Sequence, residues 1–275
     1  MTDRIRPDTI FTAAVKHWWK SKLGASPKRR KSQGGTRDSN LRGDTMDGFR
    51  DAIVDVLVKA GVDRNDIFTG SQFSRLASLL PCYFRASKNW DVIVCKNSLY
   101  KRLLGEVAAG EKPVLIAAIE FKSQEGSIGN NQNNRIEESI GSATDFWASY
   151  EHKNFLHLQP RPWLGYLFIG KYEEEDVAKS VEIRQPHFPA DAAFKGKESA
   201  ERASSVKYGG PSYAERYRIF LERMIAKKLY DGACMLVTNE KLSSHEQNYL
   251  CLFPELSGAQ FADGLTRYIR AYYPN

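Results

Sequence analysis

The chain has 275 residues, of which 42% are hydrophobic, so its length and composition suit one compact domain with a sizeable core. No apolar run approaches the roughly 20 residues that a membrane-spanning helix needs. The first ten residues also lack the apolar core of a signal peptide. We therefore expect a cytoplasmic protein without a membrane-spanning helix.

Several common kinds of enzyme have no signature in the sequence. The four cysteines and five histidines form neither a C-x-x-C pair nor a cluster at zinc spacing, and no G-x-x-x-x-G-K-[ST] or G-x-S-x-G motif occurs. These absences argue against NTPase, zinc protease and serine hydrolase chemistry. The formal charge of +7 favours a polyanionic partner, although many basic proteins bind nothing acidic.

The first element predicted along the chain is a helix over residues 9–23. Its apolar face holds Phe11, Val15 and Trp18 or Trp19. Residues 24–45 follow as a long basic loop, rich in Gly, Ser, Lys and Arg. This loop fits two interpretations, a solvated linker or an arm that orders along DNA phosphates.

The middle of the chain predicts alternating helices and strands. Residues 46–60 indicate an amphipathic helix, followed by a strand over 91–95, a short helical insertion over 98–108 and a strand over 113–121 that is buried on both faces. The core stripe expected on the first of these helices is Phe49, Ile53, Val54 and Leu57.

A second helix, over 134–151, separates the strand 113–121 from another buried strand over 163–170, and this order predicts a right-handed βαβ crossover. The inward stripe expected on that helix is Ile136, Ile140, Ala143, Trp147 and Tyr150.

The last third of the chain predicts a long loop region over 171–210, then a helix over 211–229, a strand over 233–239 and a closing helix over 258–273. The complete pattern is that of an α/β protein, a mixed central β-sheet flanked by helices on both faces. We expect residues 1–275 to form a single domain.

Polar residues interrupt the most apolar predicted strand. Glu120 and Lys122 lie two positions apart, so they point to the same side of the strand, and we expect them at its end. Asp91 begins another apolar strand and lies beside Glu120 if the two strands are neighbours.

Two neighbouring carboxylates repel each other, and a hard divalent cation relieves that repulsion. Asp91, Glu120 and the main-chain carbonyl of Phe121 would supply half of the octahedron that Mg²⁺ prefers. Lys122 would then orient the attacking water or stabilise charge on phosphate oxygens, which suits phosphodiester hydrolysis. The alternative is a simple salt bridge between Glu120 and Lys122.

The pattern Asp…Glu-x-Lys resembles the signature of PD-(D/E)xK nucleases, with Trp90 before the aspartate in place of proline. The segments "LPCYFRASKNWDVIV", "AAIEFKSQEGSIGNNQNNRIEESIGSATDFW" and "MDGF" further resemble type II restriction endonucleases of the XhoI family. The resemblance covers residues 10–255 and is densest over 79–147. Extra residues between "CKNS" and "PVLIAA" depart from the family pattern.

This resemblance implies a restriction-endonuclease-like core with Asp91, Glu120 and Lys122 as the catalytic triad. It also implies a bacterial, Mg²⁺-dependent enzyme that cuts double-stranded DNA at CTCGAG or a related palindrome. A palindromic site requires a two-fold dimer, so we expect a homodimer. A DNA methyltransferase acting on the same site is the implied cellular partner.

The stretch "GSIGNNQNNR" precedes the predicted helix and offers groups that read bases. Asn and Gln pair with adenine and Arg with guanine in the major groove, so Asn133, Asn134 and Arg135 are candidate DNA contacts. The alternative is a polar turn with an asparagine cap.

Three further residues, Arg85, Lys88 and Gln124, are candidate contacts to the DNA backbone or the site water, and solvated surface charge explains the two cations equally well. Asp47 and Asp51 could add an acid to the metal site, although exposed acids in the N-terminal part of a helix explain both better. Three other functions remain open at this stage: a nuclease of DNA repair that recognises structure, a DNA-binding module without catalysis, and a metal hydrolase that does not act on nucleic acid.

Overall fold

The computed structural model describes residues 8–23, 44–69, 80, 82–96, 114–126, 128–154, 156–157, 161–173, 176–177 and 211–273. The α-helices are α1 (Thr12–Leu23), α4 (Asp47–Ala60), α7 (Ile128–Glu151), α10 (Tyr213–Ala226) and α11 (Gly258–Tyr272). The strands are β1 (Ile67–Thr69), β2 (Val92–Cys95), β3 (Val114–Gln124), β4 (Leu156–His157), β5 (Trp163–Lys171) and β6 (Gly232–Thr238). Short 3₁₀ turns are η1 (Asp44–Met46), η2 (Arg64–Asp66), η4 (Leu242–Ser244) and η5 (Pro254–Leu256).

These strands form one mixed sheet in the order β1-β2-β3-β5-β6, with β4 also paired to β3. The pairs β1–β2 and β2–β3 are antiparallel, whereas β3–β5 and β5–β6 are parallel. Because β3 and β5 are parallel neighbours joined through α7, the predicted βαβ unit is present.

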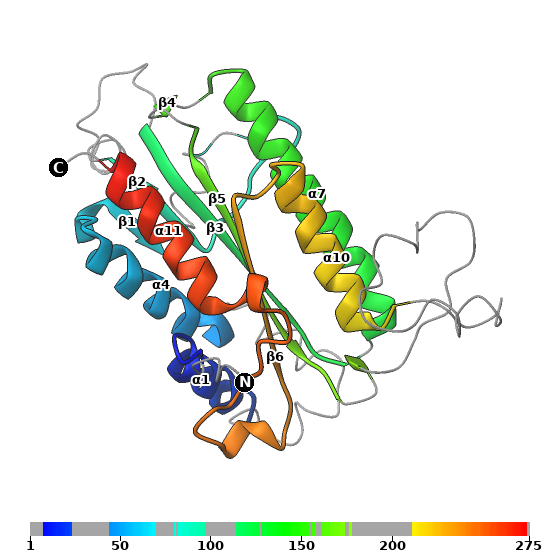
Figure 1. Cartoon of the computed structure of the whole chain (residues 1–275). Helices are drawn as coiled ribbons and strands as arrows, with labels where there is room; N and C mark the ends of the chain where they lie inside the picture. The colour runs from blue at the N-terminus through cyan, green and yellow to red at the C-terminus, as the bar shows by residue number, and fades with distance from the viewer. Residues whose placement is uncertain are drawn as a thin grey trace, which may run out of the picture.

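Helices cover both faces of this sheet (Figure 1). Helices α7 and α10 pack with one buried cluster that includes Tyr166, Tyr217 and Tyr230. Helices α1, α4 and α11 pack with the other, which includes Phe49, Leu167 and Leu265. The predicted α/β class with a mixed sheet flanked by helices is confirmed, and a strand such as β3 can be almost wholly apolar because both of its faces are buried.

Strand β3 is longer than predicted, and this changes the position of the polar pair. It continues past Glu120 and Lys122 to Gln124, which still pairs with Gly170 of β5. The expectation that the pair lies at a strand end is therefore wrong. Polar residues are tolerated within the strand because their side chains find charged or hydrogen-bonding partners there.

Helix α7 begins at Ile128, six residues before the predicted start, so "GNNQNN" is helical rather than a turn. Its buried stripe also differs from the prediction, since Ile140 is 41% exposed. Small polar side chains face the sheet instead, and Ser139, Ser142 and Ser149 are buried. Serine can occupy such a face because its hydroxyl bonds to the helix, as Ser139 Oγ does in donating to the Arg135 carbonyl at 2.7 Å.

The other predicted elements match the structure to within a few residues, including the core stripe of α4. The helix predicted over 98–108 lies outside the described residues, as do nearly all of the basic loop 24–45 and most of the loop region 171–210. Among the described helices, none combines the length and apolar character needed to span a membrane.

Candidate active site

The antiparallel pairing of β2 with β3 brings the first two predicted acids together. Val92 is opposite Ile119, which places Asp91 beside Glu120. The main chain reinforces this register, since the Asp91 N–H donates to the Ile119 carbonyl at 3.0 Å. The Phe121 N–H donates to Asp91 Oδ2 at 2.7 Å and fixes the side chain. The two strands are thus neighbours, as the predicted site requires.

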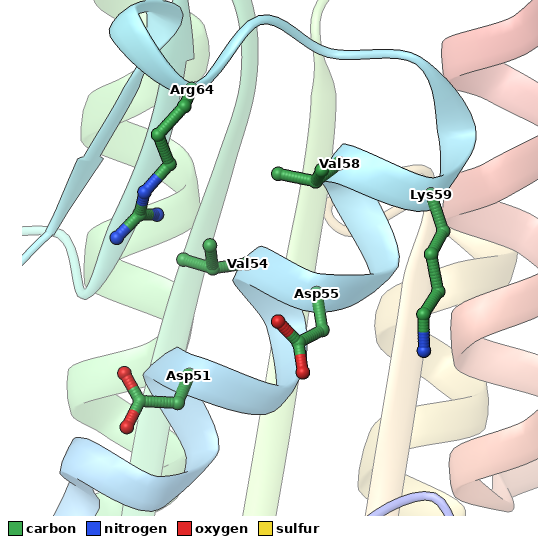
Figure 2. Close-up of a pocket in the computed structure, with 6 residues that line it drawn as sticks. All are labelled: Asp51, Val54, Asp55, Val58, Lys59 and Arg64. Atoms are coloured by element: carbon green, nitrogen blue, oxygen red, sulfur yellow. The ribbon is translucent and has the colours of Figure 1, made fainter.

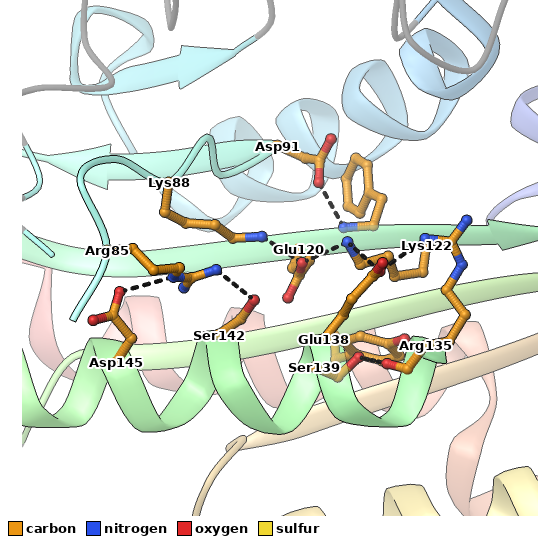
Figure 3. Close-up of polar contacts among 12 residues, drawn as sticks. Arg85, Lys88, Asp91, Glu120, Lys122, Arg135, Glu138, Ser139, Ser142 and Asp145 are labelled. Carbon is orange, nitrogen blue, oxygen red and sulfur yellow. Dashed lines mark hydrogen bonds and ion pairs between the residues drawn. The ribbon is translucent and has the colours of Figure 1, made fainter. Parts of the chain in front are cut away.

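Glu120 is fully buried and is the centre of a charged cluster (Figure 3). Its Oε1 accepts from Lys88 Nζ at 2.5 Å and contacts Lys122 Nζ at 2.9 Å. Its Oε2 accepts a hydrogen bond from the Tyr230 hydroxyl at 3.0 Å. Two ammonium groups therefore crowd one carboxylate oxygen, while a neutral hydroxyl holds the other.

The charges of this cluster explain why a buried acid stays ionised. Burial alone would raise the pKa of Glu120, but the positive charges of Lys88 and Lys122 outweigh it and lower the pKa to about 2. Burial acts to lower the pKa of Lys122, yet the Glu120 charge raises it overall. For Asp91, burial and the nearby Glu120 raise the pKa despite the Phe121 hydrogen bond. A divalent cation between the two acids would reduce the repulsion between their negative charges.

Lys88 lies inside the cluster, although the sequence suggested only a contact to the DNA backbone. It precedes β2 by four residues, and its ammonium lies 5.2 Å from the ring centroid of Trp90 as well as against Glu120. The buried Trp90 packs edge-on against Phe146 of α7. The aromatic contact thus anchors the segment that delivers both Lys88 and Asp91.

Arg85 is held by helix α7 rather than left as free surface charge. Its Nε donates to Asp145 Oδ2 at 3.1 Å, and it also contacts Ser142 at 3.5 Å. The same aspartate accepts the N–H groups of Tyr83 and Phe84 at 2.9 and 2.6 Å. In this structure Arg85 therefore fixes the segment before β2 onto α7.

The candidate DNA-reading residues lie on the first turns of α7 instead of before it. Asn133 and Asn134 are exposed, and Asn133 Oδ1 accepts from Arg216 of α10 at 3.0 Å. Arg135 pairs with Glu138 at 2.8 Å, and Glu138 is also 3.6 Å from Lys122. This end of α7 therefore connects to the Glu120 cluster through Glu138.

Gln124 lies on the same face of β3 as Glu120 but is only 3% exposed. Its Nε2 donates to the Ile128 carbonyl at 3.0 Å and so holds the start of α7. Because the side chain is buried, direct contact with DNA is not open to it in this structure.

The two acids suggested on α4 have other surroundings. Asp47 forms an ion pair with Arg50, whose charge is one of the influences that lower the pKa of Asp91 against burial. Asp51 lines a surface pocket on α4 together with Asp55 and Arg64 (Figure 2). Neither acid joins Glu120 in the polar contacts of Figure 3.

Two contributors to the cluster were missed by sequence reasoning. Tyr230 is 110 residues from Glu120, and no local pattern links the two positions. Glu138 lies one helical turn after Arg135, so a helix starting at Ile128 would have placed it near the site. Long-range packing is the signal that one sequence does not carry.

The donors present fit a hard divalent cation in type. Asp91, just before β2, and Glu120 of β3 offer carboxylate oxygens, and Phe121, which follows Glu120 and bonds to Asp91 through its N–H, offers a main-chain carbonyl. Within the described part of the chain, no group of three or more His, Cys, Asp or Glu side chains could hold a metal. Two carboxylates suit Mg²⁺, which keeps several of its waters when bound.

Comparisons with known proteins identify the family of the chain. The family model described as "Restriction endonuclease XhoI" matches residues 26–250. The type II restriction enzyme BstVI of Geobacillus stearothermophilus is 36% identical over 208 residues, covering 75% of this chain and 79% of that protein. AbrI of Azospirillum brasilense is 35% identical over 180 residues, covering 64% and 71%.

The type II restriction enzyme XhoI of Xanthomonas vasicola is 32% identical over 222 residues, covering 80% of this chain and 76% of that protein. No solved structure gives a significant match. The matched segment 26–250 contains every strand of the sheet and the whole Glu120 cluster. The chain therefore belongs to the XhoI family of type II restriction endonucleases.

Proposed function

We propose that this chain hydrolyses phosphodiester bonds of double-stranded DNA in a Mg²⁺-dependent, sequence-specific reaction. The observation that carries the proposal is the juxtaposition of Asp91, Glu120 and Lys122 on adjacent strands, with a buried carboxylate that two ammonium groups neutralise. A structural salt bridge needs one cation for one acid. Glu120 Oε1 instead contacts two ammonium groups, an arrangement that suits a place where charge is exchanged during a reaction.

In this mechanism Asp91, Glu120 and the Phe121 carbonyl would hold the ion. A bound Mg²⁺ supplies a Lewis acid that lowers the pKa of water and neutralises charge on the phosphate. Lys122 orients the attacking water and stabilises the charge that develops on the phosphate oxygens. Its ammonium already lies 2.9 Å from Glu120 Oε1, close to where the ion would be held.

Lys88 has two roles in this mechanism, one toward Glu120 and one toward the DNA. Its ammonium neutralises Glu120 in this structure, and it would be displaced from Oε1 if a divalent cation were held there. A lysine freed at that point is a cation beside the scissile phosphate, since its segment leads directly into Asp91. Lys88 thereby exchanges one anion for another without leaving a buried charge unpaired.

Recognition of bases is assigned to three polar side chains in the first turns of α7, of which the two asparagines are exposed and the arginine is half-buried. Asn133, Asn134 and Arg135 could bond base edges or phosphates, and Arg135 would exchange Glu138 for DNA when it does so. The family resemblance supports a CTCGAG-like palindrome. A palindrome calls for a homodimer with two-fold symmetry, and a methyltransferase acting on the same site would protect the host DNA.

Digestion of unmethylated plasmid tests this proposal. With Mg²⁺, the chain should give discrete bands whose sequenced ends share one palindrome, and methylated plasmid should stay intact. Cutting at DNA structures regardless of sequence would indicate a repair nuclease. Salt-dependent DNA binding without any cutting would leave a binding module and contradict the catalytic assignment.

A further inference from the structure

In the loop between α10 and β6, hydrogen bonds fix the residues directly before and after Tyr230. Lys228 has a positive φ of 55°, and the Leu229 N–H donates to the Met224 carbonyl at 2.9 Å, which ends α10 sharply. The Leu229 carbonyl accepts from Trp147 Nε1 of α7 at 2.9 Å. This network leaves the backbone of the loop little freedom.

Asp231 anchors the other side of the loop to β5. Its N–H donates to the Leu164 carbonyl at 2.7 Å, and its Oδ2 accepts from the Leu164 N–H at 2.8 Å. Arg161 donates to Asp231 Oδ1 at 2.5 Å. Tyr230 is therefore held between two fixed residues, so the position of its backbone is also fixed.

The Tyr230 ring extends from this loop into the core beneath the active site. The side chain is 1% exposed, and its ring lies edge-on to Tyr166 with 5.3 Å between centroids. The hydroxyl has two acceptors within reach, Glu120 Oε2 at 3.0 Å and the Ser139 carbonyl at 3.2 Å. The charged, nearer carboxylate is the stronger acceptor for its single proton.

This hydrogen bond gives the two carboxylate oxygens of Glu120 different roles. The carboxyl group of glutamate rotates easily about its last torsion, which has broad, two-fold preferences. Tyr230 holds Oε2 on the core side, so Oε1 is the oxygen presented to Lys88 and Lys122. In metal sites, such partners of a ligand set its orientation and strongly affect affinity.

We propose that Tyr230 is a positioning residue of the nuclease site, which orients the Glu120 carboxylate so that Oε1 alone serves the divalent cation. The inference rests on the proposed role of Glu120 as a metal ligand. It links the α10–β6 loop to catalysis, although this loop lies on the opposite side of β5 from β3 in the sheet order and the Tyr230 side chain is buried.

Binding of Mn²⁺ to the full chain tests this inference, because carboxylate sites that accept Mg²⁺ also accept Mn²⁺ and the free ion has a paramagnetic resonance signal. Tyr230→Phe keeps the ring and removes only the hydroxyl. We expect its Mn²⁺ affinity to fall by about 10–100-fold. Raising the metal concentration should then restore most of the plasmid cleavage, since the catalytic groups remain.

Tyr217→Phe is the matched control. Tyr217 is equally buried, and its hydroxyl lies 2.7 Å from the Tyr166 hydroxyl rather than near Glu120. This variant should lower the melting temperature without moving the Mn²⁺ affinity. Comparable metal affinity in Tyr230→Phe and Tyr217→Phe would overturn the inference, whichever variant is less stable.

A third variant separates this inference from the proposed function. Glu120→Gln should lose most Mn²⁺ binding if Glu120 is a ligand. Wild-type binding by Glu120→Gln would contradict the proposed function itself. Weak binding by Glu120→Gln together with unchanged binding by Tyr230→Phe would contradict only the positioning role.

Discussion

Two buried acids, Asp145 of α7 and Glu120 of β3, differ in the groups that contact them. The comparison separates an acid that fixes the structure from one that we propose takes part in the reaction. Asp145 of α7 accepts two main-chain N–H groups, from Tyr83 and Phe84, and one guanidinium, from Arg85. Glu120 of β3 instead meets two lysine ammonium groups and one phenol. Main-chain donors cannot leave without unfolding a segment, whereas lysine side chains can swing away.

We infer that the type of partner, rather than burial, distinguishes the proposed catalytic acid from the structural one. Asp145 and Glu120 are both almost fully buried. The first fixes the segment before β2 onto α7, and the second gathers mobile charge beside Asp91. This contrast between Asp145 and Glu120 predicts how variants of each residue and of their partners should behave, and the following measurements test it.

The largest effect is expected from Glu120→Ala, which removes the proposed metal ligand and leaves β3 otherwise intact. Plasmid cleavage with Mg²⁺ should fall by about 10³-fold or more, because the ion loses a carboxylate. DNA affinity in a gel-shift assay should stay constant or rise, since a negative charge near phosphates is gone. Substantial cleavage by this variant would mean that Glu120 is only a salt-bridge partner.

Lys122→Ala should reduce cleavage by about 10²–10³-fold while both carboxylates keep their ability to bind metal. Single-turnover cleavage rates and Mn²⁺ titration together measure the two properties. A parallel loss of metal binding would assign Lys122 to holding the site together instead of to the chemical step.

Asp145→Asn tests the structural side of the contrast. Weakening three hydrogen bonds to a charged acceptor should lower the free energy of unfolding by about 2 kcal/mol, measured by urea denaturation. At a temperature where the variant is folded, cleavage should stay within about 3-fold of wild type. A collapse of cleavage in fully folded protein would show that the contrast between Asp145 and Glu120 is wrong.

The smallest effect is expected from Lys88→Met, which removes one of the two cations on Glu120 Oε1. The Mg²⁺ concentration for half-maximal cleavage should fall by about 3–10-fold, because less positive charge competes with the ion. Lys171→Met is the control, since Lys171 pairs with Glu240, an exposed acid, at 2.6 Å. An equal shift in both variants would reflect overall charge alone.

The parts of the fold that the sequence predicted are those with a strong local pattern. The apolar run before Glu120 predicts a buried strand, and the stripe from Phe49 to Leu57 predicts α4. The start of α7 was missed because "GNNQNN" has no apolar period. It is helical because Ile128 is buried and Gln132 Nε2 donates to the Tyr213 carbonyl at 2.8 Å.

In the candidate site, too, the residues with a sequence signature could be predicted and those brought in by long-range packing could not. Glu120 and Lys122 are two positions apart at the end of an apolar run, and the resemblance to PD-(D/E)xK nucleases adds Asp91, so a single sequence could suggest all three. The contact of Lys88 with Glu120 spans 32 residues, and that of Tyr230 spans 110. Contacts of that kind depend on the packing of distant elements, which periodicity does not reveal.

The most direct measurement is a crystal structure of the complex with cognate DNA and Mn²⁺, using anomalous scattering to locate the ion. Lys122→Ala suits this experiment, because it keeps both carboxylates while cutting slowly. We predict one ion bound by Asp91 and Glu120 Oε1, with Lys88 moved from Oε1 to a DNA phosphate. An ion elsewhere, with Lys88 still 2.5 Å from Glu120, would contradict the account.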